Sequence, residues 1–226
     1  MDETMGHQGR TILFISHNLG AVKHLTSKCI LLNHGKLMQF DQTETVINTY
    51  LQENLKGEES GSVDLTDPVW RRGTGKNPEL NMTFQSISLK NDKGQVTNVF
   101  FEQEAINIEL AIQSKITANS AELIIVVLSF EGTVLMSAFS KEIFQPVKEG
   151  LYKTKCRFHP NLLRSGYYRI RLYMKSGHWQ DVIAEAITLK VEINPEDEEE
   201  ISYAITSPGI VGLIRAKYQW DPVQRV

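Results

Sequence analysis

The chain has little cysteine, no long apolar run and no surplus of positive charge. Cys29 and Cys156 are its only cysteines in 226 residues, which excludes a disulfide framework and fits a reducing compartment. No apolar run approaches the roughly 20 residues that span a bilayer, and the acidic start at residues 1–4 does not resemble a signal peptide. A net charge of −3 gives no electrostatic case for binding nucleic acid. We therefore expect a cytoplasmic protein that does not bind nucleic acid.

Patterns that would indicate catalysis or metal binding are also missing. Sugar cleavage needs two carboxylates that converge on one bond, but the acids here lie in turns, in a linker or in the run at 196–200. The six histidines are scattered, so we predict no metal site. No Gly-rich loop precedes a Lys-Ser/Thr pair, and no apolar strand precedes Asp2 and Glu3. We expect this chain to be no enzyme and to bind no cofactor.

What the chain does contain divides into three parts. Its apolar content of 41% and charged content of 23% are ordinary for a soluble globular protein. Residues 1–51 alternate short apolar runs with helical spacing. Residues 52–80 are first polar and rich in Glu, Gly and Ser, then irregular, which predicts a linker and a lead-in segment. Residues 81–226 hold repeated short strands separated by turns.

The first part reads as a fragment of an α/β domain. Five strand formers at 11–15 predict a strand buried on both faces. Apolar residues at helical spacing follow over 19–29, and two short strands are predicted at 30–32 and 37–40. Thr43 is placed to cap a helix.

The third part predicts the fold class: a mainly β protein with an antiparallel, immunoglobulin-like or jelly-roll β-sandwich. The reason is seven or eight short strands at regular spacing with no long helix between them. The predicted strands are 82–90, 106–112, 121–130, 133–140, 150–159, 166–174 and 183–193.

The strand at 166–174 carries the first candidate site. Side chains two apart share a face of a strand, so Tyr168, Ile170, Leu172 and Met174 are expected in the core. The opposite face holds Tyr167, Arg169, Arg171 and Tyr173, here called the Tyr–Arg ladder. Aromatic rings can stack on sugar rings, and guanidinium groups can donate to hydroxyls or carboxylates. The alternative is an ordinary outward sheet face of good strand formers.

The strand at 150–159 offers a second row of positive charge. Its outward side chains are Lys153, Lys155, Arg157 and His159. If this strand pairs beside the Tyr–Arg ladder, the joint surface suits an acidic sugar or a phosphate-bearing glycan. We therefore add Arg157 and His159 to the candidate carbohydrate-binding residues.

The opening segment resembles a known family. Residues 9–18, Gly-Arg-Thr-Ile-Leu-Phe-Ile-Ser-His-Asn, are similar to the last strand and switch loop of an ABC-transporter ATPase. The resemblance continues to residue 51 and implies that residues 1–51 are a truncated α/β remnant of such a domain. It implies that His17 is the switch-loop histidine, which contacts the γ-phosphate region. Since the other nucleotide-binding motifs are missing, we expect His17 to be inactive in this chain.

An ATPase end, a polar linker and a β-sandwich together resemble the ATPase subunits of bacterial polysaccharide exporters, the Wzt family. Residues 72–75, 151–168 and 212–220 resemble further segments of that family. The resemblance implies that the sandwich binds a cytoplasmic lipid-linked polysaccharide of the O-antigen type and passes it to a membrane-spanning exporter. It also implies a homodimer, peripheral at the bacterial inner membrane, whose full-length parent uses ATP and magnesium. The alternative is a dimerisation or protein-interaction module without a glycan pocket.

Overall fold

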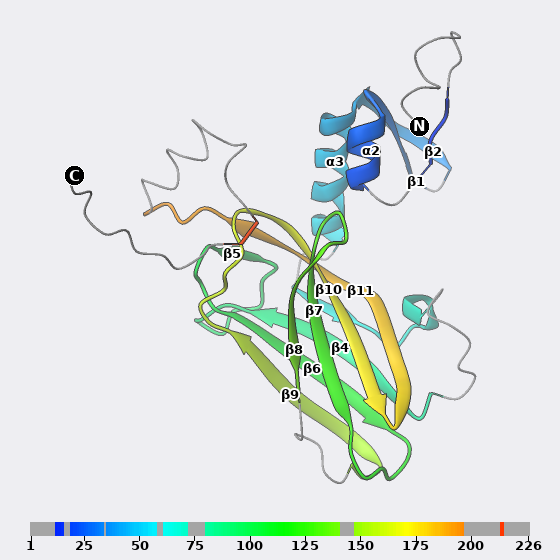
Figure 1. Cartoon of the computed structure of the whole chain (residues 1–226), viewed down its shortest axis with the longest axis vertical. Coiled ribbons are helices and arrows are strands. Elements are labelled where there is room, and N and C mark those ends of the chain that lie inside the picture. Colours follow the sequence, from blue (N-terminus) through cyan, green and yellow to red (C-terminus); the bar gives the residue numbers. More distant parts are fainter. Residues whose placement is uncertain are drawn as a thin grey trace, which may run out of the picture.

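The structure, a computed structural model, describes most of the chain (Figure 1). The described residues are 12–15, 19–33, 35–57, 61–71, 80–140, 147–196 and 213–214. Within these residues no helix has both the length and the apolar character needed to cross a membrane.

A small helix–hairpin unit lies at one end of the molecule (Figure 1). It consists of α2 (Leu19–Leu25), β1 (Lys28–Asn33), β2 (Lys36–Gln42) and α3 (Thr43–Gly57), and β1 pairs with β2 in an antiparallel hairpin. The predicted helix start at Thr43 is confirmed.

The helix α3 packs on one face of this hairpin. Val46 and Leu51 on α3 and Leu31 on β1 are buried there. The hydroxyl of Thr43 donates to the carbonyl of Thr26 at 3.0 Å, which fastens the start of α3 to the end of α2.

The strand predicted at 11–15 is wrong for the residues that the structure describes. Residues 12–15 belong to no strand, and the side chains of Ile12, Leu13 and Ile15 are exposed. A fully buried strand needs sheet neighbours on both sides, and nothing in the described part of the chain pairs with this segment.

The predicted linker is more ordered than its composition suggests. The helix α3 continues to Gly57, and β3 (Ser62–Asp64) begins shortly afterwards. Gly61 lies between them with φ +62°, and a Cβ there would approach backbone atoms of Thr97 to 2.4 Å. Only glycine fits this close contact, so the chain enters the sandwich through a fixed point. The division of the chain into three domains stays a prediction.

Two sheets form the sandwich, as predicted (Figure 1). The four-stranded sheet has the order β3, β4 (Met82–Lys90), β6 (Ile106–Ser114), β9 (Gly150–Phe158). The five-stranded sheet has the order β5 (Val99–Phe101), β11 (His178–Glu192), β10 (Gly166–Ser176), β7 (Glu122–Ser129), β8 (Val134–Phe139).

The strand order is that of an immunoglobulin-like sandwich. The strands β4, β6 and β9 take the places of A, B and E, and β8, β7, β10 and β11 take those of C′, C, F and G. All of these pairs are antiparallel, and β5 pairs with β11 in parallel. The predicted fold class is confirmed, although the short strands β3 and β5 were not predicted.

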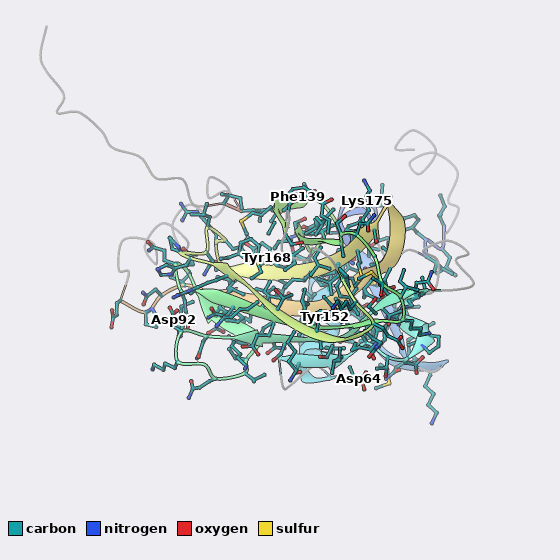
Figure 2. The ribbon with its side chains drawn as sticks, turned by 90° about the horizontal axis from the view of Figure 1, so that it is seen from below. Asp64, Asp92, Phe139, Tyr152, Tyr168 and Lys175 are labelled. Carbon is teal, nitrogen blue, oxygen red and sulfur yellow. The ribbon has the colours of Figure 1, made fainter. Side chains whose placement is uncertain are left out.

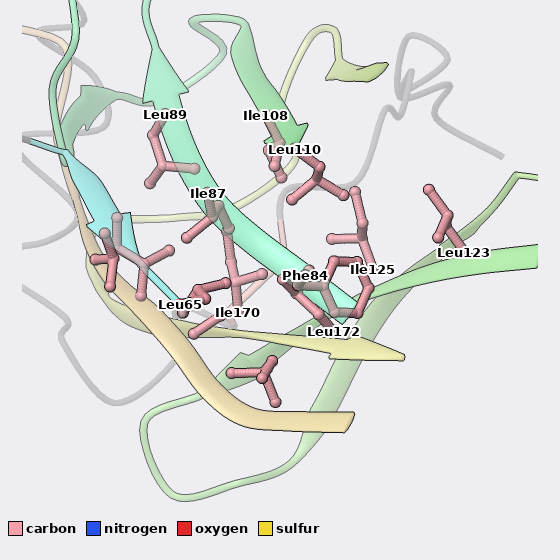
Figure 3. Close-up of a cluster of buried hydrophobic side chains, with 14 of the residues drawn as sticks. Leu65, Phe84, Ile87, Leu89, Ile108, Leu110, Leu123, Ile125, Ile170 and Leu172 are labelled. Atoms are coloured by element: carbon pink, nitrogen blue, oxygen red, sulfur yellow. The ribbon is translucent and has the colours of Figure 1, made fainter. Parts of the chain in front are cut away.

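The core fills the space between the two inner faces (Figure 3). Phe84 of β4 is fully buried and faces Leu172 of β10 and Ile125 of β7. The alternation predicted for β10 is confirmed, since Tyr168, Ile170, Leu172 and Met174 are all buried.

Tyr168 anchors the turn that leads into β10. Its hydroxyl donates to the carbonyl of Arg164 at 2.6 Å, four residues upstream. This is the tyrosine corner found near the start of strand F in immunoglobulin-like domains. Burial, assisted by the nearby charges of Glu102 and Glu131, raises the pKa of Tyr168 to about 12.

A buried ion pair joins the two sheets at their β3–β11 side. Arg71, at the end of the 3₁₀ turn Pro68–Arg71, donates from Nε and Nη2 to the two carboxylate oxygens of Asp181 on β11, at 2.9 and 2.8 Å. Asp181 also accepts from the backbone N–H of Phe84 on β4 at 2.8 Å. The guanidinium reaches the carbonyls of Leu65 and Phe84 at 2.7 and 2.9 Å.

We expect Asp181→Asn to destabilise the protein by about 3–5 kcal/mol, because it leaves the Arg71 charge buried without its partner. Urea unfolding followed by tryptophan fluorescence measures this loss. Asp92→Asn is the matched control, since Asp92 pairs with Arg157 while both side chains are about half exposed, at 43% and 51%. That change should cost less than about 1 kcal/mol. Equal losses for the two variants would contradict the role assigned to Asp181.

The raised pKa of Tyr168 predicts a loss of stability at high pH. Between pH 10 and 12 the unfolded phenol has lost its proton while the folded one keeps it. The free energy of unfolding should therefore fall in this window by up to about 1.4 kcal/mol per pH unit. Urea unfolding of the wild type and of Tyr168→Phe at several pH values checks this. The variant should show a shallower fall, and identical slopes would contradict the prediction.

Candidate functional site

The Tyr–Arg ladder lies on the outer face of the five-stranded sheet, as predicted from its alternation. All four of its side chains are half-buried rather than exposed. Figure 2 shows Phe139 and Lys175 of this sheet on the opposite side of the molecule from Asp64 of the four-stranded sheet. The two outer faces are therefore separate surfaces.

Arg169 is bound by two other residues of its own chain, Phe130 and Glu185. Its Nη2 donates to the carbonyl of Phe130 at 2.7 Å, and its guanidinium lies 5.1 Å from the centre of the Phe130 ring. Its Nη1 forms an ion pair with Glu185 on β11. These two hydrogen bonds join β10 to the β7–β8 turn and to β11, while the buried Nε of Arg169 has no hydrogen-bond partner among the described residues.

Arg171 and Tyr167 are held in a similar way. The strand pairing between β10 and β11 shifts at Arg171, and its Nε donates to the carbonyl of Ala184 at 3.1 Å in this bulge. The ammonium of Lys190 lies 5.9 Å from the centre of the Tyr167 ring. A hydrogen bond to Glu192 raises the pKa of Lys190, so this lysine stays charged.

These contacts give the ladder a structural role. Arg169 is paired with Leu128 and Arg171 with Val126 on β7, and both apolar residues are buried although they do not belong to the inner core cluster. Arginine stems commonly cover apolar surface in this way. Carbohydrate binding by the ladder stays a prediction, for which a ligand would have to use the aromatic faces and the remaining donors.

The expectation that the strand at 150–159 lies beside the ladder is wrong. The strand β9 pairs with β6 in the four-stranded sheet, whereas the neighbours of β10 are β7 and β11. An immunoglobulin-like connection places consecutive strands E and F in opposite sheets. Arg157 therefore lies on the outer face of the other sheet, where it pairs with Asp92 at 2.7 Å, and His159 is an exposed residue just after the end of β9. His17 lies outside the described residues.

An open groove of about 440 Å³ occupies the outer face of the four-stranded sheet. Eight residues line it, and two of them, Leu110 and Thr154, fall at the inward positions of their strands. The six at outward positions are Ser86 and Ser88 of β4, Glu109 and Ala111 of β6, and Lys153 and Lys155 of β9. Its volume lies in the range of ligand clefts. The hollow exists because three of the six side chains are serine or alanine. Lys153 and Lys155 had been recognised in the sequence as outward side chains, but nothing in the sequence marked the small residues.

The strand register places these six residues in two rows across the sheet. One row is Ser86–Ala111–Lys153, and the next is Ser88–Glu109–Lys155. Glu109 forms an ion pair at 2.7 Å with Lys90, which lies one row further along β4. The groove therefore combines small hydroxyl side chains with ammonium groups.

The groove has no arrangement typical of a hydrolase or a metal site. Glu109 is the single carboxylate of its lining, whereas glycosidases use two. Nowhere in the described ranges do three His, Cys, Asp or Glu side chains gather as a metal site would require. The arrangement can bind a polar ligand by hydrogen bonds and charge.

No family model matches the chain. Among solved structures, the chain is similar to a crystal structure of the C-terminal domain of Wzt, with a TM-score of 0.53 and 12% identity, over 70% of this chain and 96% of that one. At this identity the likeness shows the fold alone, and it confirms at the level of the fold the resemblance inferred from the sequence.

Two further solved structures show weaker likeness. One is a CARDB domain from Pyrococcus furiosus, solved in complex with di-metal ions, with a TM-score of 0.34 and 11% identity over 52% of this chain and 100% of that one. The other is a Bacteroides uniformis β-glucuronidase, with a TM-score of 0.32 and 16% identity over 42% of this chain and 12% of that one. Neither likeness is close enough to carry an argument.

We expect Arg171→Ala to lower the free energy of unfolding by about 1–3 kcal/mol, because it removes the bond to Ala184 and uncovers Val126. Urea unfolding measures the change. Arg157→Ala serves as the control, since its side chain is half exposed and its ion pair should be worth less than about 1 kcal/mol. If both variants were equally stable, the structural role of the ladder would be refuted.

Proposed function

We propose that the sandwich binds a polysaccharide in the groove on β4, β6 and β9, and that it serves as the substrate-recognition part of an ABC-type polysaccharide exporter. The groove carries this proposal, because it is an open polar hollow of ligand size on a sandwich with the fold of the Wzt C-terminal domain. The sequence resemblance of residues 9–51 to an ABC ATPase supports the same reading.

The ligand of this proposal is a lipid-linked glycan of the O-antigen type on the cytoplasmic side of the inner membrane. Its other partners are a membrane-spanning exporter subunit and a second copy of the same protein. ATP and magnesium belong to the parent ATPase in this proposal, and this chain hydrolyses no ATP by itself. The Tyr–Arg ladder remains a second candidate surface for the glycan.

A dimerisation module is the alternative. The strands β8 and β9 are each the last strand of their sheet in the described structure, so each has an unpaired edge. Val134 and Phe139 on β8 and Leu151 on β9 are exposed beside these edges. Unpaired edges of this kind are able to accept a strand from another chain.

Calorimetric titration of the full chain with the polysaccharide of the producing cell tests the proposal. Ala111→Trp fills the hollow between Ser86 and Lys153, and we expect it to weaken binding at least about tenfold, or about 1.4 kcal/mol. Ser137→Trp, which places the same ring on the exposed strand β8 of the other sheet, should leave binding unchanged.

The outcomes separate three readings. Binding that is lost in Ala111→Trp and kept in Ser137→Trp supports the groove. Binding that survives Ala111→Trp but is lost when Tyr167 and Tyr173 become alanine moves the site to the ladder. If no glycan binds at millimolar concentration while sedimentation shows a stable dimer, the dimerisation module replaces the proposal.

A further inference from the structure

We infer that the groove selects glycans that carry an anionic group, a carboxylate or a phosphate, and that Lys153 is the main residue that binds this group. The inference deepens the proposed function and rests on it.

The outer face around the groove has more cations than carboxylates. Three adjacent rows of the sheet, together with the turn after β4, hold Lys90, Lys153, Lys155 and Arg157 against Glu109, Asp92 and Asp64, which lies on β3 next to Ser86. The chain as a whole has a net charge of −3. The positive surplus is therefore local to this face and does not follow from overall composition.

Each of the three carboxylates of this face already has a partner. Glu109 binds Lys90 at 2.7 Å, Asp92 binds Arg157 at 2.7 Å, and Asp64 accepts from the backbone N–H of Thr66 at 2.8 Å. Lys153 and Lys155 form no ion pair within the described part of the chain. Of the four cationic side chains of this face, the two without an ion pair, Lys153 and Lys155, are the two that line the groove.

The two lysines differ in what lies opposite them. Lys155 faces Glu109 across the strand pair, so the carboxylate reduces the local potential there. Lys153 faces Ala111, whose methyl group supplies no charge and leaves space beside the ammonium. The hollow beside Ala111 therefore lies next to the Lys153 ammonium, which has no carboxylate opposite it.

The rest of the lining suits a sugar. The hydroxyls of Ser86 and Ser88 have no side-chain hydrogen bond to any residue that the structure describes. Each hydroxyl is able both to donate to and to accept from the hydroxyls of a sugar ring. A ring placed over the serines can direct its anionic substituent along the row towards Lys153, whose ammonium provides three donors.

Two variants of one residue isolate the charge from the shape of the groove. Ala111→Glu places the missing carboxylate opposite Lys153, and Ala111→Gln adds the same bulk without charge. The probes are matched pairs: methyl mannoside with its 6-phosphate, and methyl glucoside with methyl glucuronide. Inorganic phosphate is titrated separately. Binding to the full chain is followed by NMR shifts of the backbone amides of the six groove residues.

For the wild type we expect each anionic probe to bind at least about tenfold more tightly than its neutral partner at low salt, and this preference to shrink as salt is added. Ala111→Gln should weaken both members of a pair by the same factor. Ala111→Glu should abolish the preference itself. Lys153→Gln should reduce the preference to less than about twofold, and Lys155→Gln should reduce it less. Lys175→Gln on the five-stranded sheet, on the opposite side of the molecule, should leave it unchanged.

Each remaining outcome overturns a defined claim. If anionic and neutral probes bind equally in the groove, the anionic selectivity is wrong while the glycan function stands. A preference that persists in Ala111→Glu or Lys153→Gln refutes the role of Lys153. If inorganic phosphate binds as tightly as the sugar phosphate and no neutral sugar binds, the groove is a simple anion site. If neither these probes nor the polysaccharide bind, both the inference and the proposed function fail.

Discussion

The buried ion pair between Arg71 and Asp181 joins the two sheets of the sandwich along one side. Beyond β3, the edge of β4 has no strand partner among the described residues, and the N–H and carbonyl of Phe84 would be left unpaired inside the protein. Arg71 and Asp181 satisfy both groups and each other. A buried ion pair is tolerable only when its remaining donors and acceptors are also bonded, and here the carbonyl of Leu65 completes the set. The sheets are joined on this side, while β8 and β9 keep open edges on the other.

Much of the fold could be predicted because the strands alternate cleanly. In β9 and β10 the inward and outward side chains fall as the period of two requires. The partners of each strand could not be predicted, because alternation states which face is buried but not against which neighbour. That is why Arg157 was expected beside the ladder but lies on the outer face of the other sheet, and why His159, expected there too, follows the end of β9 instead. The strands β3 and β5 escaped notice because three residues are too few to show a period. Residues 12–15 have strand propensity, but a segment forms a strand only where a neighbouring strand is available to pair with it.

The candidate site shows a different limit. Sequence reasoning selected aromatic and arginine side chains because these residues are able to bind sugars. In the structure Arg169 and Arg171 use some of their donors to bind Glu185, Phe130 and Ala184. The groove instead arises where side chains are small, at Ser86, Ser88 and Ala111. A hollow is made by missing bulk at positions that are adjacent only across strands, and a linear sequence does not show that adjacency. The tyrosine corner at Tyr168 had a possible signal, a tyrosine just after the glycine that opens strand F, but one tyrosine among seven is a weak one.

The groove lies on the sheet that the chain enters directly after the helix–hairpin unit. The chain leaves α3, passes Gly61 and joins the edge of the four-stranded sheet as β3. Gly61 is fixed at this point because its carbonyl accepts from the N–H of Leu89 on β4 at 2.7 Å and its Cα lies against Thr97. The next strands in the same sheet are β4, β6 and β9, which line the groove. A ligand in the groove therefore contacts the sheet that receives the chain from α3, whereas a ligand on the ladder would contact the other sheet. The helix α3 also contacts β11 of the five-stranded sheet, so both sheets touch the helix–hairpin unit, and the covalent connection from α3 runs into the four-stranded sheet.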